Sequence, residues 1–145
     1  MRWLAAFLLT LLVSAAPAQA RDWQVRMLNR GPDGTAMAFA PAFLAIQPGD
    51  TVHFLATDRG HNAETMPGMI PPGAAPFRGR INEEIVIRFT APGLYGYKCL
   101  PHLGMGMVGL IQVGRATNRA EIASAAASLP GLGKRVMERL LASVR

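Results

Sequence analysis

Proline and glycine divide most of this chain into short segments, and this punctuation constrains the fold more than any other feature. Apolar stretches are separated by turns such as Gln47–Asp50 (QPGD) and Ala91–Gly93 (APG). Proline presets φ in such turns, and glycine tolerates positive φ. Short strands separated by turns are typical of an antiparallel sandwich or barrel. We therefore expect an all-β fold with strands at Trp23–Asn29, Ala42–Ile46, Thr51–Ala56, Glu84–Phe89, Gly93–Tyr97 and Val108–Val113.

Side-chain alternation supports this interpretation most clearly in the strand that ends at Phe89. Ile85, Ile87 and Phe89 fall on one face, while the charged residues of the same segment mostly face away. The segment Met66–Arg80, in contrast, contains four prolines. Because proline cannot donate to a strand ladder, we expect this segment to form a long surface loop.

The last part of the chain changes to helical periodicity. Asn118, followed by Glu121 three residues later, is typical of a capping box at the start of a helix. We expect one helix over residues 118–129, a break at Pro130-Gly131, and a second helix over residues 132–144. Both should pack onto the sandwich within a single domain of residues 21–145. Their expected apolar faces are Ile122, Ala125, Ala126 and Leu129 in the first, and Leu132, Val136, Met137, Leu140, Leu141 and Val144 in the second.

Residues 1–20 have the parts of a secretory signal. Arg2 supplies a positive charge, residues 3–13 form an apolar run, and Ala18-Gln19-Ala20 offers small residues for cleavage. An apolar run of eleven residues is well short of the roughly 20 needed to span a bilayer, which argues against a membrane anchor. We expect cleavage after Ala20, a chain of 125 residues, and export to the bacterial periplasm.

The charge balance narrows the class of partner. The formal net charge is +6, and about +5 once Arg2 is removed. Nucleic-acid binders usually concentrate their basic residues in a stripe, whereas here they are dispersed over loops and the C-terminal tail. We therefore expect no nucleic-acid binding and no stable membrane association. A monomer that meets an acidic protein surface fits this charge better.

Cys99 is the only cysteine, and its surroundings predict a metal site. In an oxidising compartment a single cysteine is intermolecular, reactive or metal-bound. Alternation places Cys99 on the core-facing side of its strand, and Pro101 ends that strand because it has no N–H to donate. His102 then lies in a loop whose glycines let the chain fold tightly and bring Met107 back towards Cys99.

Thiolate, imidazole and thioether ligands together favour copper. A trigonal set of two histidines and one cysteine with a long axial methionine is the blue-copper arrangement, which requires a second histidine. His53 lies within a strand, on the face opposite its apolar neighbours, where a histidine is usually exposed or hydrogen-bonded. His61 follows the end of a strand in the loop DRGHNAE, and a loop can reach another loop at the same end of a sandwich. We therefore choose His61.

Two simpler interpretations of Cys99 compete with the metal site. Cys99 could be a nucleophile with His102 as its base, but this pairing usually has a third group that orients the histidine. It would also give Met107 no role. Alternatively, Cys99 could be a buried structural thiol and His102 an ordinary surface residue. The complete Cys-x-x-His-x-x-x-x-Met spacing, closing a strand–loop–strand unit in an exported β protein, argues against both.

Two segments carry a family resemblance. GYKCLPHLGMGMVGLIQVG (residues 96–114) and GDTVHFLATDRGHNAE (residues 49–64) resemble pseudoazurins, small blue-copper proteins of the cupredoxin superfamily. The similarity covers nearly all of residues 21–145, including the pair of C-terminal helices, which plastocyanins lack. It implies a cupredoxin-like Greek-key β-sandwich with two short C-terminal α-helices.

The resemblance also implies a set of copper ligands. The family's ligands correspond to His61, Cys99, His102 and Met107. Met105 is the alternative for the axial position, but the family pattern matches the second methionine, Met107. One type 1 copper ion per chain follows from this set.

Three further positions acquire expected roles from the resemblance. Met37 corresponds to a methionine that packs near the exposed ligand histidine. Asn62 is a candidate for a backbone donor to the Cys99 sulfur. Pro101 withholds an amide from the same region, and we expect this to raise the reduction potential.

The function implied by the resemblance is one-electron transfer by Cu(II)/Cu(I) cycling, without enzymatic activity. The expected partners are periplasmic redox proteins, above all a nitrite reductase of denitrification, and c-type cytochromes. His102 is the expected electron port, because its loop also contains Pro101, Leu103 and Met105 and should form an apolar patch. Basic residues could surround this patch and steer a partner towards it, and the candidates are Arg30, Arg59, Arg78, Arg80 and Lys98. For Arg78 and Arg80 it is equally open that they are ordinary solvated surface charges without this role.

Two other functional classes remain as alternatives. A copper-trafficking or storage protein would use methionines as Cu(I) ligands, and Met66, Met69, Met105 and Met107 are the candidates. Such proteins usually have open, methionine-rich sites, and retention of copper through redox cycling would argue against this class. A copper enzyme would need an open coordination position or a second metal. His53 alone cannot furnish that second site.

Overall fold

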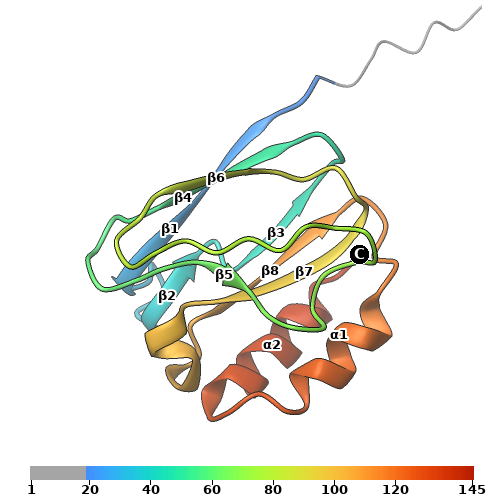
Figure 1. Ribbon diagram of the computed structural model, residues 1–145. Coiled ribbons are helices and arrows are strands. Elements are labelled where there is room, and N and C mark those ends of the chain that lie inside the picture. The colour runs from blue at the N-terminus through green and yellow to red at the C-terminus, as the bar shows by residue number, and fades with distance from the viewer. Residues whose placement is uncertain (1–18) are drawn as a thin grey trace, which may run out of the picture.

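The computed structural model describes residues 19–145, and it forms a sandwich of two four-stranded sheets (Figure 1). The expected signal segment lies almost entirely in residues 1–18, outside the described part. Within the described residues, no helix is long and apolar enough to cross a membrane. Sheet A has the order β2 (Ala36–Ala40), β1 (Asp22–Arg30), β4 (Thr51–Leu55) and β6 (Ile85–Arg88). Sheet B has the order β3 (Phe43–Ile46), β8 (Val108–Val113), β7 (Gly93–Lys98) and β5 (Glu64–Thr65).

The strand pairing is mixed, whereas the sequence predicted an antiparallel sandwich. Strand β1 pairs with β4 in parallel, and β3 pairs with β8 in parallel. The remaining pairs, β1–β2, β4–β6, β7–β8 and β5–β7, are antiparallel. The six expected strands are confirmed with small shifts at their ends, and β2 and β5 are additional. The parallel pairs arise because the chain crosses from one sheet to the other instead of returning through a hairpin.

The space between the sheets is filled by an aromatic core. Tyr97 packs edge-on against Phe39 and Phe54, with ring centroids 4.7 and 5.2 Å apart. Cys99 and Met107 belong to this same buried cluster. The predicted direction of the Cys99 side chain, towards the core, is therefore confirmed.

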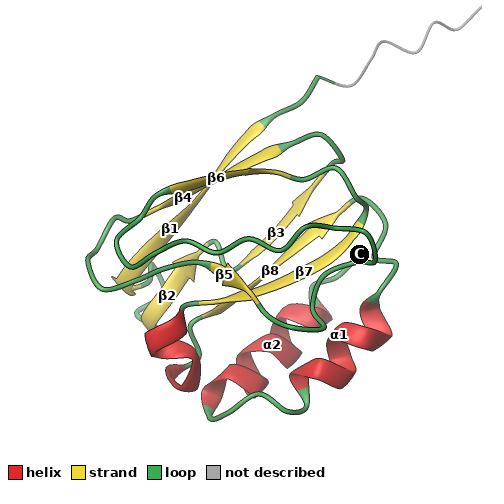
Figure 2. Ribbon diagram, viewed as in Figure 1, coloured by secondary structure: helices red, strands yellow, loops and turns green. Residues whose placement is uncertain are grey.

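Two helices, α1 (Arg119–Ala126) and α2 (Leu132–Ala142), lie along sheet B (Figure 2). A second cluster of buried apolar side chains packs between these helices and the sheet. Helix α1 contacts β7, and α2 contacts β8. Strand β8 is consequently buried on both faces, so its sequence, VGLIQV, shows no alternation. The predicted pair of short C-terminal helices is confirmed.

Three local predictions need correction. Asn118 does begin α1, but its side chain makes no capping hydrogen bond; it bonds instead to the buried N–H and C=O of Leu94, at 2.7 and 3.0 Å. Leu132, expected on the apolar face of its helix, is half exposed. The segment Met66–Arg80 lacks strand structure apart from an isolated bridge at Arg78, as expected, but it is not simply a surface loop. Its residues Met66, Met69 and Phe77 are buried.

Candidate metal centre

The loop that follows β7 folds back on itself and returns to Cys99. Residues Leu100–Met105 form a short 3-10 helix, η1, which ends at Gly106 with a positive φ of 93°. The N–H of Met107 donates to the His102 carbonyl at 3.1 Å, and the N–H of Cys99 donates to the Met107 carbonyl at 3.0 Å. These bonds hold Met107, which is fully buried, beside Cys99.

A second loop, between β4 and β5, brings His61 to the same end of the sandwich. Gly60 has a positive φ of 92°, a conformation that glycine adopts without strain. Asn82 clamps this loop on both sides of the turn: its Oδ1 accepts the Gly60 N–H at 2.6 Å, and its N–H donates to the His61 carbonyl at 2.8 Å. The position of His61 is thus fixed by the backbone and not only by its ring.

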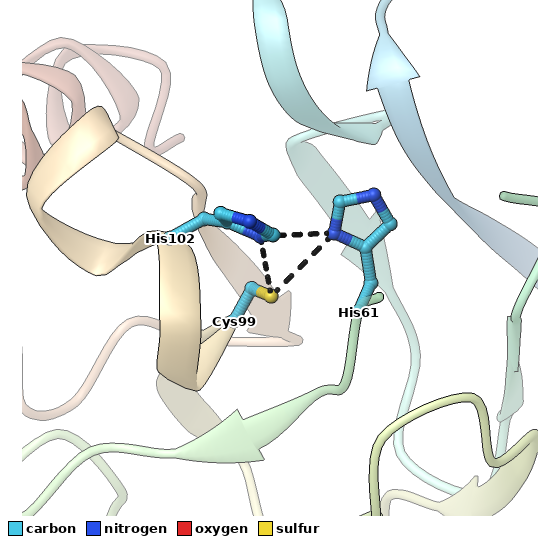
Figure 3. A group of neighbouring side chains, drawn as sticks. All are labelled: His61, Cys99 and His102. Carbon is cyan, nitrogen blue, oxygen red and sulfur yellow. Dashed lines mark hydrogen bonds between the residues drawn. The ribbon is translucent and has the colours of Figure 1, made fainter. Parts of the chain in front are cut away.

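The side chains of His61, Cys99 and His102 converge on one point (Figure 3). The two Nδ1 atoms are 3.1 Å apart, and the Cys99 Sγ lies 3.7 Å from His61 Nδ1 and 3.4 Å from His102 Nδ1. A triangle with these edges has a centre about 2.0 Å from all three atoms, close to the length of metal bonds to imidazole and thiolate. One thiolate and two imidazoles suit copper. The arrangement therefore fits a single copper ion without rearrangement.

The outer nitrogen of His61 has a fixed partner. Its Nε2 lies 2.9 Å from Asn29 Oδ1, an oxygen that can only accept a hydrogen bond. The proton must then reside on Nε2, which leaves the lone pair of Nδ1 directed at the site. His61 is fully buried and Asn29, at the end of β1, covers it. His102 is partly exposed, so one of the two histidines faces solvent.

Burial and neighbouring groups set the protonation of the apoprotein. Burial lowers the pKa of His61, the nearby His102 lowers it further, and Asp58 opposes both. Burial also raises the pKa of the Cys99 thiol, and the backbone N–H groups of Asn62 and His102 act in the opposite direction and lower it. The His102 N–H itself donates to the Cys99 carbonyl at 3.2 Å. The effect of the Asn62 N–H on the thiol has the direction expected of a donor near the sulfur, and the hydrogen bond itself stays a prediction. A thiol whose pKa is raised is a poor nucleophile, which argues against the interpretation of Cys99 as a catalytic residue.

Asn62 also joins the two loops through its side chain. Its Oδ1 accepts the N–H of Leu100, next to Cys99, at 2.7 Å. Its Nδ2 donates to Glu64 Oε2 at 3.1 Å and to the Gly79 carbonyl at 3.0 Å. These three partners fix the orientation of the amide, so the cysteine loop and the histidine loop move as one unit.

Comparisons with known proteins agree with this geometry. The family model of copper binding proteins of the plastocyanin/azurin family matches residues 25–114. The chain is 45% identical over 141 residues to the pseudoazurin of Paracoccus pantotrophus, an alignment that spans 97% of this chain and 96% of that protein. This chain belongs to the pseudoazurin family.

Two further pseudoazurins extend the comparison. A putative pseudoazurin of Rhizobium leguminosarum bv. viciae is 56% identical over 104 residues, 72% of this chain and 68% of that protein. The crystal structure of native pseudoazurin from Hyphomicrobium denitrificans is 40% identical, with a TM-score of 0.80 over 86% of this chain and 98% of that one. The fold is therefore the cupredoxin fold. Its cofactor is copper, and its function is electron transfer and not enzymatic catalysis.

His53, Met66 and Met69 lie away from the pseudoazurin site, whereas Met105 lies on the same short helix as His102. His53 lies on β4 and pairs with Asp22, Nε2 to Oδ1 at 3.6 Å, which agrees with the choice of His61. Met66 and Met69 are buried in the layer under the helices, and Met105 is 47% exposed. They form no cluster with Met107, which belongs to the core between the sheets, so the methionine-rich site of a trafficking protein is not present among the described residues.

The surface around His102 is apolar, as expected from the sequence. Pro101, Gly104 and Met105 are exposed, and Leu103 is partly buried. Two large apolar residues, Leu100 and Leu132, are also about half exposed.

Three of the five members of the expected basic rim take part in ion pairs with two carboxylates. Glu64 is 7% exposed and pairs with Arg78 Nε at 3.2 Å and Lys98 Nζ at 3.6 Å. Arg80 pairs with Glu83 at 3.4 Å. The remaining members, Arg30 and Arg59, lie outside these pairs, and Arg30 donates to the Gly34 carbonyl at 3.0 Å.

Sequence reasoning missed Asn29 and Glu64 and placed Met37 only by resemblance. Asn29 is an ordinary polar residue at the end of a strand, and Glu64 carries no motif. Met37 lies on β2 with a φ of 52° and lines a groove together with Gly106 of the ligand loop. The sequence offered no local signal for Asn29 or Glu64, because their partners lie far away along the chain.

Proposed function

We propose that the chain is a periplasmic carrier of single electrons whose copper is held by His61, Cys99, His102 and Met107. The observation that supports this most strongly is the triangle of donor atoms with its centre about 2.0 Å from each of them. The three donors lie in loops that are already fixed by backbone hydrogen bonds, so the site is preorganised for the metal.

Each residue contributes a distinct property. Cys99 would supply the soft thiolate, the two histidines would each supply an imidazole nitrogen, and Met107 would supply the thioether. When bound, copper supplies a Cu(II)/Cu(I) couple that stores one electron between a reduced donor protein and an oxidised acceptor protein. Asn62 and Asn29 hold Cys99 and His61 in place, so that the geometry changes little between the two oxidation states.

We assign His102 as the point at which electrons enter and leave. Of the two ligand histidines, His102 is the one that is partly exposed, and apolar residues surround it. A partner can press against such a surface without burying unpaired charge. Glu64 offsets only one of the two positive charges beside it, so the basic residues keep a net positive charge and we expect the association rate to fall as salt is added.

The partner and location follow from the sequence and the family. We propose that residues 1–20 are a signal peptide removed after Ala20, and that the protein acts as a monomer in the periplasm. A nitrite reductase is the proposed acceptor, and c-type cytochromes are proposed as further redox partners, as the resemblance to pseudoazurins implies.

Electron transfer to a purified copper-containing nitrite reductase tests the proposal. The reduced protein is mixed with the enzyme, and the second-order rate is measured for wild type, Met105→Glu and Val86→Glu. Met105 borders His102, whereas Val86 is a similarly exposed apolar residue on β6 and serves as the matched control. We expect a large fall in rate for Met105→Glu alone. Equal effects of both variants would contradict docking at His102, and loss of copper to the partner would favour trafficking.

A further inference from the structure

The first backbone nitrogen of the domain lies in a polar site formed by Asp50. The N–H of Arg21 donates to Asp50 Oδ1 at 2.8 Å. The other carboxylate oxygen accepts hydrogen bonds from Trp23 Nε1 and from the Gln47 N–H, both at 3.0 Å. Asp50 is 2% exposed and belongs to the turn between β3 and β4. Arg21 is also fixed on its other side, because its carbonyl accepts the Thr51 N–H at 2.9 Å.

We propose that removal of the leader after Ala20 converts this hydrogen bond into an ion pair that stabilises the folded domain. Hydrolysis of the Ala20–Arg21 peptide bond consumes one water and leaves a carboxylate on Ala20. It also leaves an α-amino group on Arg21, which takes up a proton and faces Asp50. This inference rests on the proposed cleavage and is independent of the proposed electron transfer.

The surroundings of the scissile bond suit this event. Gln19, Ala20 and Arg21 are exposed, so a signal peptidase can reach the bond. Together with Asp50 they line a cavity of about 500 Å³ at this end of the sandwich. Cleavage removes Gln19 and Ala20 from this lining, which opens the space beside Asp50 for the new ammonium group.

The charges around the site favour an ionised Asp50. Burial raises the pKa of Asp50, but the hydrogen bonds from Gln47, Arg21 and Trp23 outweigh it and the net shift is downward. The other charged groups nearby are the Arg21 side chain, the Asp22–His53 pair on β1 and β4, and Arg88 of β6, which lies close to Gly49. Asp50 is therefore the acid that directly contacts the Arg21 nitrogen.

The pH dependence of this ion pair has a definite sign. A free α-amino group has a pKa of about 7.7–8.0, and a carboxylate beside it raises the pKa in the folded state. The stabilisation is then fully present below about pH 7.7 and is lost as the pH rises through the raised folded value.

The test compares two copper-loaded forms of residues 21–145, one with a free α-amino group and one with an Nα-acetyl group. Acetylation keeps the N–H donor and removes the charge. Unfolding in urea is followed by the fluorescence of Trp23, the only tryptophan left when Trp3 is removed with the leader. At pH 6.5 we expect the folding equilibrium constant of the free form to be about fivefold larger, and at pH 10 we expect the two forms to be equal.

In Asp50→Asn the free and the acetylated form should be equally stable at pH 6.5, because the negative charge that pairs with the α-amino group is then absent. Equal stability of the two forms at pH 6.5 would overturn the proposal, and so would a difference that persists in Asp50→Asn. If Asp50→Asn does not fold, an NMR titration of the free α-amino group decides, since its pKa must lie above 8 if Asp50 pairs with it. The mass of the exported protein tests the cleavage position separately.

Discussion

Replacing Asn29 by leucine should weaken copper binding without touching a metal ligand. The substitution removes the acceptor that lies 2.9 Å from Nε2 of His61, a fully buried ring. Leucine has a similar size, so it keeps water away and leaves the Nε2–H without a partner. A buried donor without a partner costs about 1–3 kcal/mol. Loss of an outer partner of a ligating histidine typically lowers metal affinity about 10- to 100-fold, which is about 1.4–2.7 kcal/mol.

Two variants of the same position separate the hydrogen bond from the covering of the ring. Asn29→Ala admits water, which can accept the His61 proton, so its loss of affinity should be smaller than that of Asn29→Leu. Asn29→Asp keeps an acceptor and should retain high affinity, although it places a second carboxylate near Asp58, which already accepts the Asn29 backbone N–H at 2.7 Å. That backbone bond survives in all three variants.

The assay is competition for Cu(I) against a chromophoric chelator under anaerobic conditions. We expect the order of affinity to be wild type, then Asn29→Ala, then Asn29→Leu. An Asn29→Leu protein that binds Cu(I) within about twofold of wild type would refute the role of this hydrogen bond. Unfolding of the metal-free variants in urea checks that the change lies in the site and not in the fold.

Three other substitutions test individual contacts. Gly133→Ala should fail to gain the roughly 1 kcal/mol of helix propensity and should alter the visible spectrum, because a Cβ there would lie 2.9 Å from the Leu103 carbonyl of the ligand loop. A stabilised variant with an unchanged spectrum would contradict this contact. Tyr97→Phe should stabilise the protein in urea by about 1 kcal/mol, since the buried Tyr97 hydroxyl finds no partner among the described residues; destabilisation would reveal one. Asn118→Ala should lower the free energy of unfolding by about 2–4 kcal/mol, because it orphans the N–H and C=O of Leu94. A loss below about 1 kcal/mol would contradict the importance of these two hydrogen bonds.

The sequence was most informative where the chemistry is local. Cys99, His102 and Met107 lie within nine residues, and the proline and glycines between them dictate a tight loop. His61 could be chosen over His53 because one follows a strand and the other lies within it. These positions require only the local pattern and a common end of the sandwich.

What the sequence could not supply depends on contacts between distant segments. Asn29 and His61 are 32 residues apart, and nothing around Asn29 indicates that β1 ends over the histidine loop. The capping box at Asn118 was a reasonable local prediction, but the buried backbone of Leu94, 24 residues earlier, competes successfully for the same side chain. Tertiary contacts therefore decided the role of both asparagines.

The two strands that were missed have weak local signals. Strand β2 has the sequence AMAFA, in which alanine contributes little strand propensity and Met37 has a positive φ. Strand β5 contains only two residues. Both are held by neighbouring strands, β1 and β7, and a single-sequence pattern does not report such pairing.

The most direct test of the central claim is the visible absorption and electron paramagnetic resonance spectrum of residues 21–145 after addition of Cu(II). A site formed by Cys99 and two histidines predicts an intense thiolate-to-copper band and a narrow hyperfine splitting. The band should disappear with ascorbate, return with an oxidant, and be absent in Cys99→Ala. A colourless protein that binds only Cu(I), or a band that persists in Cys99→Ala, would contradict the account.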